Sequence, residues 1–169
     1  MKRVIVFLSV IAIVLGLAAC GGGGTSEPAQ DESAQSESAS EKIPVDISYD
    51  FGDVVIDITS VSFGYDEFED SGTIIFHYTF TNKTDESQNP GSFWWVRFSA
   101  IQDNDPNVIV DLEGSSLPEE YFDVISAEVK PNGMMDYAAS YVLIDDVTPV
   151  TLIASQYGEE LGRTEIKIK

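Results

Sequence analysis

The chain has 169 residues, with 29 acidic and 9 basic side chains, one histidine and one cysteine, and its formal net charge at pH 7 is −20. An acidic surface repels phosphate backbones and anionic head groups, which argues against nucleic acid as a partner. It could attract cations or a basic protein, although the charge is explained as well by the solubility of an extracellular domain. A single cysteine excludes an intrachain disulfide, and one histidine cannot supply the several nitrogen or sulfur ligands of a zinc site.

The N-terminus is typical of an export signal. Lys2 and Arg3 precede residues 4–17, which are apolar apart from Ser9 and Gly16. A membrane-spanning helix needs about 20 apolar residues, and this run is shorter and ends among small residues. Residues 1–19 therefore predict a cleaved signal peptide, and its loss would lower the net charge from −20 to −22 because Lys2 and Arg3 leave with it.

The residues Leu17-Ala18-Ala19-Cys20 resemble the lipobox of bacterial lipoproteins. That resemblance implies a diacylglyceryl group on the Cys20 thiol and cleavage of the peptide bond before it. Two acyl chains anchor a protein stably, at about 0.8 kcal/mol per buried CH₂. We therefore expect a lipid anchor at the extracytoplasmic face of the cell membrane. The alternative is an ordinary secretory signal whose cleavage site contains a cysteine.

Residues 20–42 predict a flexible tether. After Cys20 they are rich in Gly, Ser, Ala, Gln and Glu, and Thr25 is the only β-branched residue among them. This composition cannot bury enough apolar surface to offset the entropy of ordering. The tether would span roughly 25 Å on average and about 75 Å when extended. One domain, residues 43–169, remains.

Alternating apolar residues separated by Gly, Pro, Asn and Asp predict that this domain is all-β. We expect an immunoglobulin-like antiparallel β-sandwich of about seven to nine strands. A one-residue slip at Thr59 and Ser60 predicts a β-bulge, residues 131–133 predict a turn, and residues 117–124 could form a short helical turn. The expected strand segments are 45–49, 54–63, 74–81, 94–100, 135–143, 150–154 and 166–168.

Four short motifs stand out in this domain: residues 78–84 (YTFTNKT), 98–103 (FSAIQD), 130–133 (KPNG) and 141–143 (YVL). Together they resemble a family of Gram-positive extracellular lipoproteins of unknown function. That family has an immunoglobulin-like sandwich and is related in fold to an immunoprotective antigen. The resemblance covers most of residues 45–169 and implies the sandwich fold and a Gram-positive host, but no activity.

Asp103, Asp105 and Asn107 match the first three ligand positions of an EF-hand calcium loop. The sixth position, which should be Gly, is Val108, and the twelfth, which should be Glu, is Gly114. Both departures favour a polar hairpin loop over a calcium site.

Two further polar features are weaker candidates. The carboxylates of Asp66, Glu67, Glu69 and Asp70 could gather a hard cation, although a solvated acidic loop explains them as well. His77 lies in the middle of an expected strand, and we expect it at the surface rather than in a catalytic triad.

Phe93-Trp94-Trp95 is the most prominent apolar motif. Neighbours on a strand face opposite sides, so if Trp94 enters the core, Phe93 and Trp95 face outward. Such an exposed aromatic pair could bind a glycan or a protein. The alternatives are that a loop covers the pair or that the strand is buried on both sides.

These observations favour a non-catalytic binding or interaction module at the cell envelope, with an unknown protein or glycan partner and with the membrane contacted through Cys20. We expect no cofactor, with calcium as the one candidate. The alternatives are a divalent-cation-binding domain or a cell-envelope hydrolase, which would need paired carboxylates in a cleft.

Overall fold

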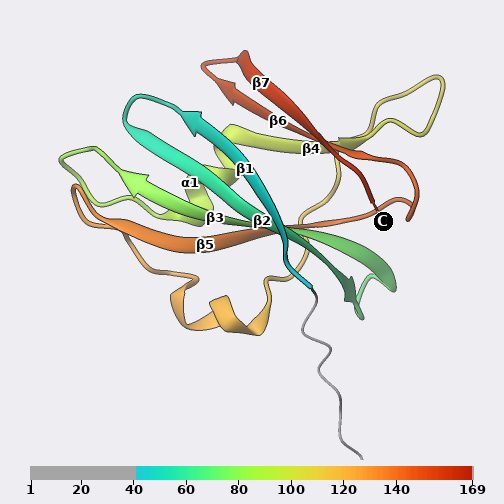
Figure 1. Cartoon of the computed structure of the whole chain (residues 1–169), viewed down its shortest axis with the longest axis horizontal. Coiled ribbons are helices and arrows are strands. Elements are labelled where there is room, and N and C mark those ends of the chain that lie inside the picture. Colours follow the sequence, from blue (N-terminus) through green and yellow to red (C-terminus); the bar gives the residue numbers. More distant parts are fainter. Residues whose placement is uncertain (1–40, 169) are drawn as a thin grey trace, which may run out of the picture. The chain divides into compact units, whose positions relative to one another are not determined.

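A computed structural model describes residues 41–168 of the chain (Figure 1). The expected signal peptide (1–19), the lipidation site Cys20 and residues 20–40 of the expected tether lie outside these residues. Within residues 41–168, no helix combines the length and the apolar character needed to cross a membrane.

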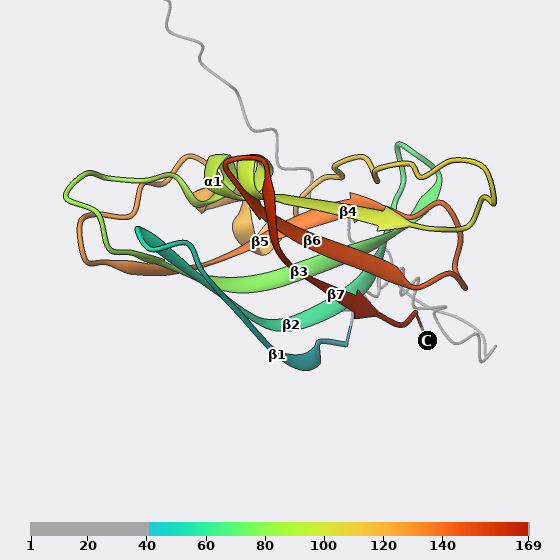
Figure 2. The ribbon, with the colours of Figure 1, turned by 90° about the horizontal axis from the view of Figure 1, so that it is seen from above.

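Two antiparallel sheets pack face to face (Figure 2), which confirms the predicted β-sandwich. The first sheet has the strand order β1-β2-β3-β5, and the second has the order β4-β6-β7. After β3 the chain crosses to the second sheet to form β4. It then returns to the first sheet for β5 and crosses again for the β6–β7 hairpin. The strands are β1 (Ile43–Asp50), β2 (Val54–Asp66), β3 (Ser71–Asn82), β4 (Phe98–Gln102), β5 (Met134–Val142), β6 (Val150–Gln156) and β7 (Glu159–Ile166).

The predicted β-bulge and turn are both confirmed. The β2–β3 register shifts between Ile58 and Ser60, so Thr59 has no directly opposed residue on β3. The slip keeps Val61 on the inner face, where it is 1 % exposed. In the turn before β5, Asn132 takes a positive φ of 59°, a conformation that Asn tolerates better than most residues.

An aromatic stack forms the centre of the core. The Trp94 ring lies between Phe98 (centroids 4.2 Å apart) and Tyr78 (4.6 Å). Its indole nitrogen donates to the Tyr141 hydroxyl at 2.8 Å, so the polar atom of this fully buried side chain is satisfied. The contacts join β3, β4 and β5, and therefore both sheets.

The expected strand 94–100 is wrong in its first half. Residues Pro90–Arg97 form helix α1, and β4 begins only at Phe98. Asn89 caps the helix by accepting a hydrogen bond from Ser92 N at 2.8 Å, with Pro90 at the first helical position. Trp94 is buried as predicted, but Val96, expected beside it in the core, is 72 % exposed.

The predicted helical turn is confirmed as the 3₁₀-helix η1 (Glu119–Val124), which starts after Pro118. Tyr121 of η1 packs with Ile75 of β3 and Ala138 of β5 in a small second core. This cluster lies on the other side of β3 from the main core, because Ile75 alternates with the inward-facing Ile74 and Phe76. The face of β3 that we expected to be exposed is thus partly covered by η1.

Candidate functional site

Three segments form the end of the sandwich at which β2, β4 and β5 finish (Figure 1). They are residues 65–70, 103–113 and 143–148, and together we call them the loop end. The Asn104 side-chain amide donates to the carboxylate of Asp145 at 2.9 Å and so joins the second segment to the third.

Gln102, the last residue of β4, fastens the loop end to the core. Its side chain is 1 % exposed and donates to the carbonyls of Asp145 (3.0 Å) and Thr148 (2.7 Å). Its amide oxygen accepts from Ile144 N at 2.6 Å. These bonds satisfy the buried amide and fix the loop from β5 to β6. A polar residue at the end of an apolar strand segment was the only sequence signal for this role.

Asp66 builds the turn between β2 and β3. It is 7 % exposed and accepts hydrogen bonds from Phe68 N (2.9 Å), Glu69 N (3.3 Å) and the Ser115 hydroxyl (2.6 Å). The Ser115 bond and then the backbone bonds lower the pKa of Asp66. Glu67, Glu69 and Asp70 are exposed around it. Asp70 accepts a hydrogen bond from the Tyr65 hydroxyl at the surface, so Asp66 is the one member of this predicted group that is buried inside the turn.

The segment after β4 folds back on its own strand, because Leu112 N donates to Ala100 O at 2.7 Å. Asp105 stabilises the bend by accepting from Asn107 N (2.7 Å) and Val108 N (3.2 Å), and the backbone bond from Asn107 lowers the pKa of Asp105. Asp103, Asp105 and Asn107 are all exposed. Within residues 41–168, no three Asp, Glu, His or Cys side chains converge on a point where a metal ion could sit.

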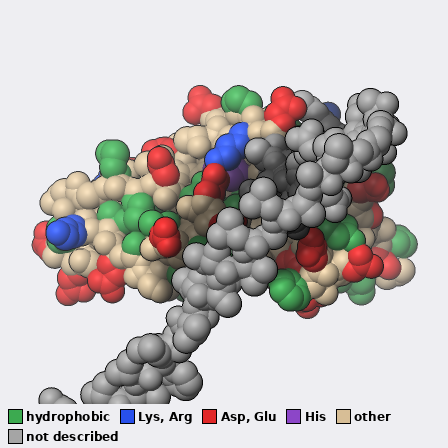
Figure 3. All heavy atoms as spheres, turned by 90° about the horizontal axis from the view of Figure 1, so that it is seen from below, with side chains coloured by type: hydrophobic (Ala, Val, Ile, Leu, Met, Phe, Trp, Pro, Cys, Tyr) green, Lys and Arg blue, Asp and Glu red, His purple; other side chains and the backbone are tan. Residues whose placement is uncertain are grey.

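Apolar side chains and carboxylates share the surface of the loop end. Its segments contain ten of the 29 acidic residues and none of the nine basic ones. Acidic side chains also outnumber basic ones on the face shown in Figure 3. Seven large apolar side chains of the loop end are at least half exposed: Tyr65 (62 %), Phe68 (93 %), Val108 (56 %), Ile109 (66 %), Val110 (51 %), Ile144 (50 %) and Val147 (75 %).

The prediction that Phe93 and Trp95 are exposed together is wrong. Phe93 lies partly buried against the core, with its ring 5.3 Å from that of Phe51. Trp95 is half exposed and packs edge-on against Tyr141, with its ring over Gly114. A Cβ at Gly114 would lie 2.9 Å from the indole, so a glycine is needed there. The helical turn of α1, absent from the prediction, sends the two side chains to different environments.

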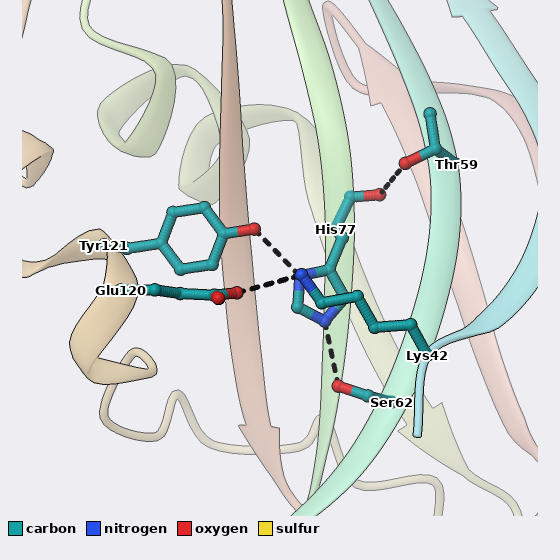
Figure 4. Close-up of polar contacts among 6 residues, drawn as sticks. All are labelled: Lys42, Thr59, Ser62, His77, Glu120 and Tyr121. Atoms are coloured by element: carbon teal, nitrogen blue, oxygen red, sulfur yellow. Dashed lines mark hydrogen bonds and ion pairs between the residues drawn. The ribbon is translucent and has the colours of Figure 1, made fainter. Parts of the chain in front are cut away.

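His77 is buried, which corrects the expected surface histidine. Its ring is 5 % exposed; Nε2 lies 2.8 Å from the Ser62 hydroxyl, and Nδ1 lies 2.9 Å from that of Tyr121 (Figure 4). Glu120 lies 4.0 Å from Nδ1 and bonds Lys42 at 2.9 Å. Burial and then the Lys42 charge lower the pKa of His77 to about 4, against the opposing effect of Glu120.

The serine–histidine–glutamate geometry resembles the arrangement of a hydrolase, but the serine is closed to substrate. Ser62 is 1 % exposed, and η1 supplies the tyrosine and the glutamate that lie over the ring. Both hydroxyls can donate or accept, so a neutral His77 is satisfied in either tautomer. The cluster therefore fastens η1 to the outer face of the first sheet.

Solved structures similar to this chain come from Gram-positive bacteria, and one of them is described as a β-sandwich protein. A protein from Enterococcus faecalis matches with a TM-score of 0.59 and 18 % identity, over 76 % of this chain and 94 % of its own. A "putative lipoprotein" from Staphylococcus aureus matches with a TM-score of 0.54 and 18 % identity, over 73 % and 94 %. An uncharacterized β-sandwich protein from Clostridium difficile matches with a TM-score of 0.52 and 16 % identity, over 85 % and 100 %.

At these identities the likeness establishes the fold alone. No curated protein matches the chain. A family model described as "Domain of unknown function (DUF5067)" matches residues 28–156, which include most of the sandwich. The chain therefore belongs to the DUF5067 family.

Proposed function

We propose that this protein is a membrane-anchored extracytoplasmic lipoprotein that acts as a non-catalytic binding module, with the loop end as its binding surface. The observation that carries the proposal is the set of exposed apolar side chains on the three segments of the loop end, which contain ten carboxylates and no basic residue. This chemistry fits a basic amphipathic partner, such as a cationic segment of another envelope protein.

The two kinds of side chain would do different work in binding. Large apolar groups such as Phe68, which is 93 % exposed, gain free energy when a partner removes them from water. A fully buried Phe side chain contributes about 1.5–3 kcal/mol. The carboxylates would attract a basic partner and orient it, which raises the association rate more than the affinity.

The anchor supports a partner that lies near the membrane. The lipobox-like sequence at Cys20 and the tether 20–42 would hold the domain within about 75 Å of the bilayer. We infer that the partner is a protein of the cell envelope.

Binding to a defined probe tests the proposal. The mature chain with Cys20→Ser would be titrated with a synthetic peptide of alternating Leu and Lys, and with the matching Leu and Glu peptide as a charge control. We expect the Lys peptide to bind saturably, to shift amide resonances of the loop end, and to bind more weakly as salt rises. The Glu peptide should not bind.

Two double variants make the test specific to the site. Phe68→Ser with Val147→Ser should weaken binding about tenfold or more, since both apolar groups are lost. Met134→Ser with Leu161→Ser removes exposed apolar groups away from the loop end and should leave the affinity unchanged. Equal losses in the two double variants, or shifts spread evenly over the surface, would reject the loop end as the binding surface.

A further inference from the structure

At the opposite end of the sandwich, the Arg97 guanidinium lies among three aromatic rings. Its central carbon is 5.9 Å from the ring centroid of Phe51, 5.5 Å from that of Phe93 and 5.4 Å from that of Tyr157. These residues come from the β1–β2 turn, α1 and the β6–β7 turn. We call the four side chains the arginine cage. Its position, far from the loop end along the strands, makes it independent of the proposed binding surface.

The hydrogen-bond donors of Arg97 are unused within residues 41–168. Its Nε is buried without a hydrogen-bond partner, and no described carboxylate lies within ion-pair distance of its side chain. Arg163, by contrast, is paired with Glu160. An arginine that pairs with no described carboxylate, in a chain with 29 acidic residues, needs an explanation.

The three ring contacts place the guanidinium over aromatic faces, and no described acceptor takes a hydrogen bond from its N–H groups. Those groups form a planar fork that matches a carboxylate in a two-bond geometry. Arg97 is only partly buried, and Nε is its one nitrogen that is both buried and unpartnered, so the terminal nitrogens face solvent. The side chain is therefore held in place by the rings while its binding edge stays open.

Tyr157 gives a second, independent indication of a site. It is 86 % exposed and has a φ of 54°, and it is followed by Gly158 at 83° in the two-residue turn between Gln156 and Glu159. Asn-Gly is the preferred pair for such a turn, and a bulky residue at the first position is strained. Residues held in strained backbone conformations cluster at functional sites, ligand clamps among them.

We propose that the arginine cage binds a carboxylate group, with Arg97 pairing with both oxygens and Tyr157 and Phe93 flanking the adjoining apolar part of the ligand. A peptide C-terminus and a small carboxylic acid share this chemistry, and the two sources are separated by the probes used. The cage would give the domain a second ligand site at the end opposite to the loop end.

Arginine side-chain NMR tests the proposal directly. The mature chain contains only two arginines, Arg97 and Arg163, so its Nε–Hε spectrum has two resonances and an internal control. The chain with Cys20→Ser would be titrated with N-acetyl-leucyl-alanine, with its C-terminal amide, and with benzoate. We expect the free acid to shift the Arg97 resonance saturably and the Arg163 resonance not at all. The amide should not bind. Tighter binding of the peptide acid would identify the ligand as a peptide C-terminus, and tighter binding of benzoate would identify it as a small carboxylic acid.

Three variants separate binding from folding. Arg97→Lys keeps the charge but loses the planar fork and should weaken binding about tenfold, whereas Arg163→Lys should leave it unchanged. Tyr157→Asn places the preferred residue in the turn, so it should weaken binding while the melting temperature stays equal or rises. Equal binding of acid and amide, no binding below about 10 mM of either acid, or equal losses in the two Lys variants would overturn the proposal.

Discussion

The buried His77 makes the stability of the domain depend on pH. The ring is 5 % exposed and its pKa is lowered from 6.5 to about 4, first by burial and then by the Lys42 charge. As the pH falls below the His77 pKa of the unfolded chain, the unfolded chain binds a proton at His77 and the folded chain does not. The stabilisation is therefore fully present above pH 6.5 and is lost as the pH falls toward 4.

The size of this loss follows from the two pKa values. One pKa unit corresponds to about 1.4 kcal/mol, so complete loss near pH 4 would reach about 3 kcal/mol. Between about pH 7.5 and about pH 5 the expected loss is about 2 kcal/mol, because the unfolded chain is then almost fully protonated and the folded chain is not. That amount is a large part of the stability of a small domain.

Urea unfolding of the wild type and of His77→Gln, at both pH values, isolates the effect. The many carboxylates contribute equally to both proteins, so only the change in their stability difference is interpreted. We expect wild type to lose about 2 kcal/mol relative to the variant on acidification. Ser62→Ala serves as a control, since it removes one hydrogen bond near the ring and keeps the histidine.

Direct NMR titration gives a second measurement that does not depend on any variant. His77 is the only histidine in the chain, so its ring resonances are unambiguous. We expect a midpoint near pH 4 in the folded protein. A midpoint near 6.5, together with parallel pH profiles for wild type and variant, would refute the reasoning that burial keeps this ring neutral.

Three other predictions concern the anchor, the core and the acidic loops. Cys20→Ala should release the protein from membrane fractions or leave its signal uncut, as cell fractionation and mass would show; normal processing and retention would exclude the lipid anchor. Trp94→Ala should lower the free energy of unfolding by about 3–5 kcal/mol in denaturant titrations, because it empties the centre of the aromatic stack; a loss below about 1 kcal/mol would contradict the packing described. Millimolar calcium should leave the melting temperature unchanged, since Asp66, Asp103 and Asp105 do not converge, whereas a clear rise would revive the calcium hypothesis.

Local patterns in the sequence predicted most of the strands. Ile74, Phe76, Tyr78 and Phe80 alternate along one strand, and all four are at most 1 % exposed. The slip at Thr59 was visible as a break in the same period of two. These predictions succeeded because side-chain alternation is a property of a single strand and needs no knowledge of its neighbours.

Helix α1 shows where the local pattern was ambiguous. Apolar residues from Phe93 to Phe98 can be read with a strand period, which placed Phe93 and Trp95 together on an outer face. Asn89 followed by Pro90 is a helix-start signal and competed with the strand interpretation of the aromatic residues that follow. Trp94 is buried in either reading, so its burial could not decide between them.

The charge of the chain, its tether composition and its alternating strands follow from the sequence by itself, because each depends on residues close together in the chain. The burial of His77, the joining of the loop end and the arginine cage were decided only by the tertiary structure. Tyr121 reaches His77 across 44 residues, and Gln156 of the β6–β7 hairpin bonds Phe51 across 105. Such partners meet because of the order in which strands pair within two packed sheets, and no local pattern of side chains encodes that order.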